Sequence, residues 1–275
     1  MKFSHLLRTQ TQTKLNAPSR GTTITRVARV PYLNSAPFYR GLSLGDRHAL
    51  TDCVPRELGE RAARGELDAG LLPLADLFRL HGRFERLGPF GIAVRGRARS
   101  VMLFARRPIR QLDGAVVAVT EETSTTAVLL RLMLEIRYHV VPSAYARGRN
   151  PDADALLLIG DEALRFQQDN RQYPFEIDVA FEWWLWQHLP FVFAVWAIRK
   201  DAASEEKKRL ELALSGALGR NAGQLEAIAQ EHAADFGLPA EELQRYLAAF
   251  IYRLSKPEEE AIQQFKRLVD EHRVL

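Results

Sequence analysis

The chain has 275 residues, of which 47% are apolar and 26% are charged, so its composition is that of a compact globular protein and excludes a disordered or membrane-embedded chain. The formal net charge is +4, but the basic residues are scattered and form no run that would follow a nucleic-acid backbone. A mildly basic surface favours the capture of a small organic anion, and the length allows one large domain or two lobes.

Residues 1–25 contain no acidic residue and many Arg, Lys, Ser and Thr residues, and they lack the continuous apolar segment of a secretory signal. This composition resembles an organelle transit peptide, but we interpret the segment as a disordered basic extension. No stretch reaches the roughly 18 apolar residues of a membrane span, and the single cysteine, Cys53, excludes an intrachain disulfide. We therefore expect a cytoplasmic protein with no membrane and no nucleic acid as partner.

The next segment predicts a βαβ unit, and hence a parallel sheet. Its expected elements are strands over residues 24–32, 49–54 and 67–72, with helices over 36–41 and 56–64 between them. Pro55 suits the first position of the second helix, and Gly65 suits its end.

A second group of short apolar strands is predicted over residues 100–105, 115–120, 155–159 and 191–198. Apolar residues at helical spacing predict a helix over 127–138, and a short helix begins at 162–166. From residue 202 to the end the pattern is helical, and Tyr246 is one of its core-facing positions.

Two groups of strands, joined by two passes of the chain and followed by helices, predict an α/β protein with two lobes, a double hinge and an interlobe cleft. We assign residues 26–112 and 200–275 to lobe 1 and residues 113–199 to lobe 2. A single doubly wound sheet would explain the same alternation of strands and helices.

The sequence PYLNSAP at residues 31–37 leaves the carboxyl end of the first parallel strand, where open α/β sheets bind ligands. Asn34 offers an amide donor and a carbonyl acceptor, and Ser35 offers a hydroxyl, so either can hold a ligand carboxylate or hydroxyl. Asn34 could equally cap the helix that follows.

A run of four hydroxyl residues, from Thr123 to Thr126, lies between a predicted strand and a predicted helix. Free backbone N–H groups and the positive end of the helix dipole make such a place a site for a carboxylate. Plain N-capping is the commoner use of these residues, but one cap does not need four hydroxyls.

The aromatic run at residues 183–196 is the densest apolar stretch, and we expect it to be mainly core, with a few rings as the wall of a pocket. His188 has no assigned carboxylate partner and is interpreted as a packed or surface residue. The chain has no Gly-rich phosphate loop, no HExxH, no GxSxG and no paired-cysteine motif, and its seven histidines are scattered. We therefore predict neither a metal nor another cofactor.

Six segments, in this order, resemble the chorismate dehydratase family of the futalosine route to menaquinone: PYLNSAP (31–37), GELDAGLLPL (65–74), RSVMLFARR (99–107), the loop and helix over 120–134, DADALLLIGDEAL (152–164) and LPFVFAVWAIRK (189–200). The resemblance implies the two-lobed, type II periplasmic-binding-protein-like fold. It also implies a cytoplasmic carbon–oxygen lyase that removes water from chorismate to give 3-[(1-carboxyvinyl)oxy]benzoate. The implied partner is the small-molecule substrate chorismate, and no cofactor is implied.

In family terms, Asn34 and Ser100 are implied to be the catalytic residues that contact and orient the substrate. Tyr32, Ser35, Thr125 and Thr126 are the expected substrate-binding residues. The enolpyruvyl carboxylate of chorismate is implied to take the C3 proton as the C4 hydroxyl departs, so the protein supplies orientation, desolvation and hydrogen bonds.

The chain departs from the family pattern at Gln187-His188, where Thr-Gly is common, and at residues 73–75, where small Ser residues are common. Glu121 and Glu122 place negative charge beside the expected carboxylate site. Two other functions therefore stay open: a non-catalytic carboxylate binder of the same fold, and a divergent lyase with another substrate.

Overall fold

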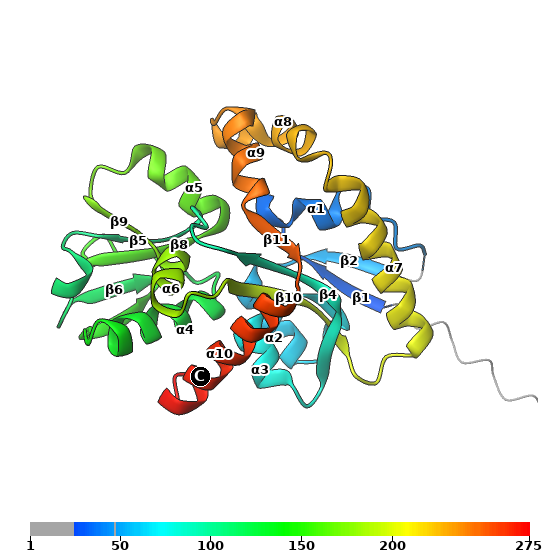
Figure 1. The fold of residues 1–275 in the computed structure, drawn as a ribbon, viewed down its shortest axis with the longest axis horizontal. Coiled ribbons are helices and arrows are strands. Elements are labelled where there is room, and N and C mark those ends of the chain that lie inside the picture. The colour runs from blue at the N-terminus through cyan, green and yellow to red at the C-terminus, as the bar shows by residue number, and fades with distance from the viewer. Residues whose placement is uncertain (1–24, 47) are drawn as a thin grey trace, which may run out of the picture.

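The computed structural model describes residues 25–46 and 48–275, and its strands form two separate mixed sheets (Figure 1). The first sheet has the order β11-β4-β10-β3-β1-β2 and contains β1 (Thr25–Arg29), β2 (His48–Asp52), β3 (Ala69–Pro73), β4 (Phe84–Val94), β10 (Phe191–Arg199) and β11 (Phe250–Arg253). The second has the order β7-β6-β8-β5-β9 and contains β5 (Val101–Ala105), β6 (Val116–Val119), β7 (Ala144–Arg147), β8 (Ala155–Ile159) and β9 (Phe175–Asp178).

The predicted two-lobed α/β architecture with parallel βαβ pairing is confirmed. Strand β1 pairs in parallel with β2 and β3, and helix α2 (Pro55–Ala63) makes the crossover, with Pro55 at its first position as predicted. In the second lobe β6 pairs in parallel with β7 and β8. The predicted extension over residues 1–25 lies outside the described residues, except for Thr25, which begins β1.

The predicted lobe boundaries at 112/113 and 199/200 are wrong. Strand β5 pairs with β8 and β9 and so belongs to the second sheet, whereas β10 pairs with β3 and β4 in the first. The chain crosses between the lobes after Val94 and returns before Phe191, and these two residues are partners in the β4–β10 ladder. Strands β5 and β10 both consist mainly of apolar residues, so their sequences do not show which of the two sheets each strand joins.

Strand β4 was not predicted, because Gly88, Pro89 and Gly91 interrupt its apolar pattern. Proline lacks an N–H group for a ladder, so it is tolerated only where the pairing is interrupted. The β4–β10 register shifts between Arg86 and Gly91, which places Pro89 in such an interruption, and the Pro89 carbonyl still accepts a hydrogen bond from the backbone of Leu254.

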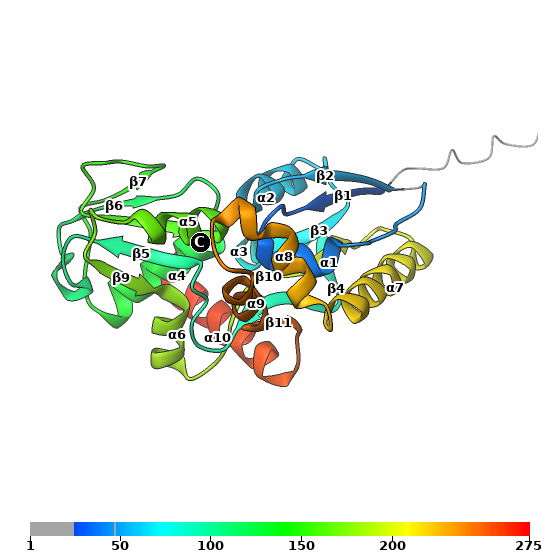
Figure 2. The same ribbon diagram turned by 90° about the horizontal axis from the view of Figure 1, so that it is seen from above.

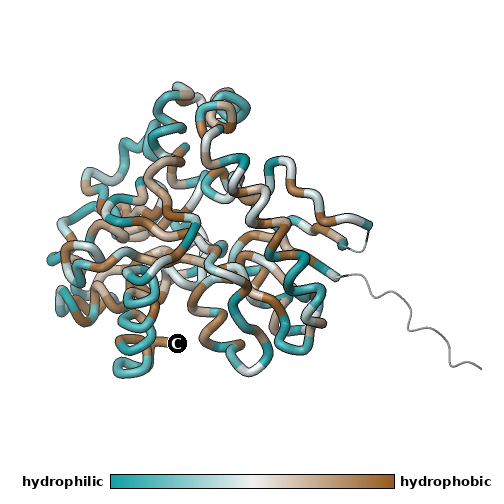
Figure 3. Tube along the Cα trace, turned by 45° about the vertical axis from the view of Figure 1, so that its right-hand side comes forward, coloured by the Kyte–Doolittle hydropathy of each residue, from teal (hydrophilic) through white to brown (hydrophobic). Residues whose placement is uncertain are grey.

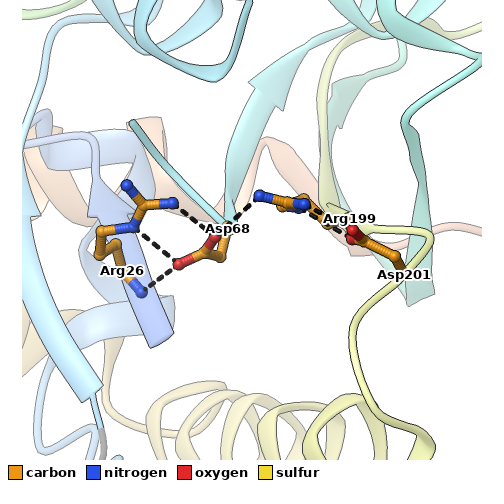
Figure 4. Close-up of polar contacts among 4 residues, drawn as sticks. All are labelled: Arg26, Asp68, Arg199 and Asp201. Atoms are coloured by element: carbon orange, nitrogen blue, oxygen red, sulfur yellow. Dashed lines mark hydrogen bonds and ion pairs between the residues drawn. The ribbon is translucent and has the colours of Figure 1, made fainter. Parts of the chain in front are cut away.

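Asp68 ties together the ends of three strands of the first sheet (Figure 4). Its carboxylate accepts hydrogen bonds from the backbone N–H of Arg26 at 2.8 Å and from the guanidinium of the same residue at 2.8 and 2.9 Å. Arg199, at the end of β10, lies 3.7 Å from the carboxylate and also pairs with Asp201. Burial raises the pKa of Asp68, but the bonds from Arg26 outweigh burial and leave this pKa below its ordinary value. The contact fixes the amino ends of β1 and β3.

Helices flank both sheets and span the space between the lobes. The remaining ones are η1 (Leu33–Ser35), α1 (Ala36–Tyr39), α3 (Leu74–Leu80), η2 (Ile109–Gln111), α4 (Thr125–Arg131), the π-helix η3 (Leu132–Arg137), α5 (Gly160–Asp169), α6 (Val179–Gln187), α7 (Ser204–Asn221), α8 (Leu225–Phe236), α9 (Ala240–Ala248) and α10 (Lys256–His272). Seen from above, α8 and α9 lie over the first lobe, on its side toward the second (Figure 2). In the described part of the chain, no helix is both long and apolar enough to cross a membrane.

The C-terminal helix α10 is largely hydrophilic in Figure 3, yet its inner side joins the lobes. Phe265 packs edge-on against Trp183 of α6 at 5.9 Å and against Phe191 of β10 at 5.1 Å, measured between ring centroids. Trp183 is fully buried, so this part of the aromatic run is core, as expected. One apolar core therefore continues from the first lobe through α10 into the second.

Candidate active site

A cavity that is partly open to solvent lies between the lobes, beyond the carboxyl ends of β1 and β3. Its walls are mainly apolar and consist of Val30, Pro55, Leu71, Pro73, Ile92, Val101, Ile159, Gly160, Phe193 and Ala194. Its polar lining consists of Tyr32, Asn34, Thr123, Thr125 and Thr126. None of these residues carries a formal charge, so a ligand here meets neutral hydrogen-bonding groups in a partly dry space.

Asn34 lies in η1 and lines the cavity, whereas Ser100 immediately precedes β5, is not among the lining residues and has no exposed surface. The hydroxyl of Tyr246, from α9, lies 2.8 Å from Ser100 Oγ and forms a hydrogen bond with it, and the Ser100 hydroxyl also lies 3.5 Å from the backbone carbonyl of Ala98. The sequence predicts Tyr246 only as a core position. The one signal of a further role was its polar tip, because a buried tyrosine hydroxyl needs a partner.

Ser35 does not line the cavity. Its hydroxyl is fully buried and bonds to the backbone carbonyls of Val30, at 2.5 Å, and Tyr32, at 2.7 Å. These bonds close the turn after β1. Asn34 makes no side-chain cap at the helix that follows, so the alternative of simple capping does not apply to it.

The four hydroxyls at the start of α4 have separate uses. Thr123 caps the helix by accepting the backbone N–H of Thr126 at 3.2 Å. Ser124 donates to Asp76 at 2.6 Å, and Thr125 accepts the backbone N–H of Ala75 at 3.1 Å, so both bond across the lobes to α3. Thr126, which bears the remaining hydroxyl, lines the cavity together with Thr125. The predicted pair therefore faces the ligand space, while the neighbouring residues hold the loop in place.

Glu122 points away from the hydroxyl run and toward the first lobe. Its carboxylate accepts a hydrogen bond from the hydroxyl of Tyr32, and its backbone carbonyl accepts the N–H of Arg56 at 3.0 Å. Burial, followed by the bond to Glu122, raises the pKa of Tyr32 far above its ordinary value, so the phenol remains a donor. The Tyr32 ring thus borders the cavity while its hydroxyl connects the lobes. Glu121 is exposed.

Asp161 makes another bond between the lobes, because its carboxylate accepts the backbone N–H of Leu33 at 3.0 Å. Burial raises the pKa of Asp161 to about 6, although the Leu33 N–H opposes this rise. Between its ordinary value of 3.8 and about 6, the folded protein holds a proton that the unfolded chain has lost. Stability contributed by this group is therefore present at low pH and is lost as the pH rises to about 6.

We predict that Asp161→Asn stabilises the protein at pH 7 by up to about 3 kcal/mol, since it keeps an acceptor oxygen and removes the buried charge. Urea unfolding of the variant and the wild type across a pH series checks this. The difference in unfolding free energy should be small below pH 4, grow as the pH rises and level off above pH 6. A difference that does not change with pH would contradict the assignment.

Gly160 has φ +59°, and a Cβ atom there would lie 2.9 Å from the ring of Tyr32. Gly160→Ala is expected to cost about 1–2 kcal/mol in backbone strain and to push the ring out of place. Gly114→Ala is the matched control, because Gly114 has φ +69° and nothing within 4 Å of a Cβ. Ligand titration should show weaker binding for Gly160→Ala and unchanged binding for Gly114→Ala, whereas equal affinities would refute the role of the ring.

From the aromatic run, Phe193 lines the cavity, as expected for a few of its rings. His188 lies outside the cavity lining and ends α6 with φ +56°. Because this left-handed conformation favours glycine, the departure from the family's Thr-Gly concerns a helix end rather than the ligand. Of residues 73–75, Pro73 does line the cavity. Among the described residues, no three His, Cys, Asp or Glu side chains are grouped as a metal site.

A sequence model of the menaquinone biosynthesis family matches residues 25–271. The chain belongs to this family. A curated member, the chorismate dehydratase of Thermus thermophilus, is 32% identical over 259 residues, which cover 85% of this chain and 91% of the relative. The predicted family is therefore confirmed.

Several solved structures have the same fold as this chain. A protein from Archaeoglobus fulgidus superposes with a TM-score of 0.75 at 17% identity, covering 94% of this chain and 100% of its own. The alkanesulfonate-binding protein of Xanthomonas axonopodis pv. citri, bound to MOPS, gives 0.65 at 16%, covering 94% and 95%. A Candida albicans protein described as having the generic periplasmic binding protein fold gives 0.58 at 12%, covering 92% and 90%. The predicted periplasmic-binding-protein-like fold is confirmed.

Proposed function

We propose that this protein is a chorismate dehydratase, a hydro-lyase that converts chorismate into 3-[(1-carboxyvinyl)oxy]benzoate for menaquinone biosynthesis. The observation that carries the proposal is the uncharged, mainly apolar cavity between the lobes, in a chain 32% identical to a chorismate dehydratase.

The neutral lining suits a reaction in which the substrate supplies its own base. When a carboxylate is transferred from solvent into a site without a cationic partner, its pKa is raised. It is then a better proton acceptor. In the proposed reaction, the enolpyruvyl carboxylate takes the proton from C3, and the C3–H electron pair forms the new ring double bond as the C4–O bond breaks. The carboxyl group then passes that proton to the departing hydroxyl oxygen, which leaves as water. Formation of the aromatic ring provides the driving force.

The residues of this chain would orient the substrate. Thr125 and Thr126 would hold a carboxylate by hydrogen bonds, and Phe193 would lie against the ring. Asn34 and Ser100 would contact the region of the departing hydroxyl, where hydrogen bonds stabilise developing charge. We also propose that the enzyme acts in the cytoplasm. It needs no metal or other cofactor in this scheme, because neither the base nor the leaving group requires one.

Incubation of the purified protein with chorismate, followed by mass spectrometry, tests this function. We expect a product lighter by one water and with the ultraviolet spectrum of a substituted benzoate. Chorismate incubated without protein is the control for spontaneous decomposition. If chorismate binds and is recovered unchanged at high protein concentration, the protein is a carboxylate binder of the same fold. Turnover of another acid and not of chorismate would indicate a divergent lyase.

A further inference from the structure

Two neighbouring residues of the first lobe hydrogen-bond to two neighbouring residues of the second, beside the cavity. Ala75 and Asp76 lie in the first turn of α3, and Ser124 and Thr125 lie at the start of α4 (Figure 1). The Asp76 carboxylate accepts the hydroxyl of Ser124 at 2.6 Å, and the backbone N–H of Ala75 donates to Thr125 Oγ1 at 3.1 Å. We call these four residues the interlobe clasp.

The Asp76 carboxylate is fixed by the packing of the first lobe. Asp76 is 7% exposed, and its Oδ1 atom accepts a hydrogen bond from Arg79 at 3.0 Å. Its Oδ2 atom, which accepts the Ser124 hydroxyl, lies against Gly59 of α2, where an added Cβ atom would overlap with it. The glycine therefore leaves the room that Oδ2 needs to face Ser124. Burial raises the pKa of Asp76, and the bond from Ser124 opposes this rise, so the clasp helps to keep the carboxylate ionised.

The bond from Ala75 fixes the role of the Thr125 hydroxyl, because a backbone N–H can only donate. Thr125 lines the cavity and is 3% exposed. Its oxygen accepts the Ala75 N–H, and its single proton is donated to no group in the part of the chain that the structure describes. This proton is therefore available to an acceptor oxygen in the cavity, and a hydroxyl that accepts one hydrogen bond is a stronger donor of another.

We propose that Asp76 is a positioning residue, which acts through Ser124 to hold the lobes where Ala75 makes Thr125 a hydrogen-bond donor to the ring carboxylate of the substrate. This inference rests on the proposed function for the identity of the substrate. Hydrogen bonds to a carboxylate lower its pKa, so such a donor suits the carboxylate that does not act as the base. Thr125 belongs to the second lobe and its N–H partner to the first, so the clasp links closure of the cleft to recognition of the anion.

Ser124→Ala removes the hydroxyl that reaches Asp76. We expect KM for chorismate to rise by about tenfold and kcat to change by less than about threefold, because the lost bond weakens the hold on a group that does not react. Ser143→Ala is the matched control, since its hydroxyl donates to the backbone carbonyl of Ala115 at 3.2 Å within the second lobe. KM of this control should equal that of the wild type. Wild-type KM in Ser124→Ala would overturn the inference.

Gly59 and Asp76 provide independent variants on the other side of the clasp. Gly59→Ala should displace Oδ2 and raise KM as Ser124→Ala does, and it decides the question even if Asp76→Ala fails to fold. Its control is Gly219→Ala in α7, where nothing lies within 4 Å of an added Cβ atom. Asp76→Asn keeps an acceptor oxygen and should stay within about threefold of the wild-type KM, whereas Asp76→Ala should resemble Ser124→Ala. Wild-type KM in Gly59→Ala, or equal KM in Asp76→Asn and Asp76→Ala, would contradict the proposed role.

A combination with Thr125→Val shows whether the clasp acts through the Thr125 hydroxyl, because valine replaces that hydroxyl with a methyl group. Ser124→Ala should then raise KM much less in the Thr125→Val background than in the wild type. An equal rise in the two backgrounds would show that Ser124 acts on the substrate by another route and would overturn the inference.

Exchange of the Ala75 backbone amide, measured by NMR without substrate, keeps this inference separate from the proposed function. Ala75 is fully buried and its N–H is bonded across the lobes, so it should exchange slowly in the wild type and in Ser143→Ala. It should exchange about tenfold faster in Ser124→Ala. Absence of chorismate turnover in the wild type would refute the proposed function, while the exchange rates would still decide whether the clasp holds. Equal exchange in all three proteins would overturn the clasp.

Discussion

Asn34→Ala is expected to lower kcat for chorismate by about 100- to 1000-fold, the usual loss when one hydrogen-bonding group at a site of developing charge is removed. Ser100→Ala should have an effect of similar size. Asn34 lines the cavity directly, and Ser100 Oγ shares a hydrogen bond with the hydroxyl of Tyr246 at 2.8 Å. Steady-state kinetics on purified variants would measure the loss.

The stability of these variants is the necessary control. Asn34 makes no side-chain cap, and Ser100 loses only a hydroxyl at a site of 0% exposure, so both should retain most of the wild-type unfolding free energy. Removal of Ser100 Oγ leaves Tyr246 without one partner, which costs about 1–3 kcal/mol. Wild-type turnover in both variants would show that the two residues are not catalytic, whereas loss of activity together with unfolding would show only a structural role.

Asp178→Ala is expected to destabilise the protein by about 3 kcal/mol, the largest loss of stability that we predict. The Asp178 carboxylate is 4% exposed and caps α6 by accepting the N–H of Phe181 at 3.0 Å. It also accepts the N–H of Arg99 at 2.8 Å, in the segment that enters the second lobe. Arg99 has φ +62°, a strained conformation for a residue with a side chain, and the bond to Asp178 holds it.

Urea unfolding measures this loss, and Asp113→Ala provides the comparison. Asp113 also accepts a backbone N–H, that of Val141 at 2.9 Å, but at an exposed position, so its loss should cost less than about 1 kcal/mol. Asp178→Asn should be milder than Asp178→Ala, because it keeps an acceptor oxygen. Equal losses for Asp178→Ala and Asp113→Ala would show that burial of the carboxylate is unimportant.

The local patterns predicted most of the elements near the site. Pro55 at the start of α2, the apolar runs of β3 and β8 and the hydroxyl run before α4 each depend on neighbouring residues, and the structure has them within a few residues of the prediction. The carboxyl end of β1 was expected to meet the ligand because parallel strands place their ends at one edge of a sheet. Asn34, Tyr32, Thr125 and Thr126 do meet there.

Contacts between distant segments could not be predicted in this way. The pairing of Tyr246 with Ser100 joins residues 146 positions apart, and no local pattern encodes it. The sheet to which β5 belongs is likewise decided by its pairing with β8 and β9, not by its own five buried residues. Ser35 was expected at the ligand because of its place in the motif, but a small hydroxyl beside a tight turn is equally suited to bonding the backbone.

The pairing of Val94 with Phe191 gives the second lobe the topology of a single continuous insert, residues 95–190. Its two junctions are neighbours across one antiparallel ladder, about 5 Å apart between Cα atoms. Recombination between family members can therefore exchange this insert as a cassette. Such a chimera would take Ser100, Thr125 and Thr126 from one parent and Asn34 and Tyr246 from the other.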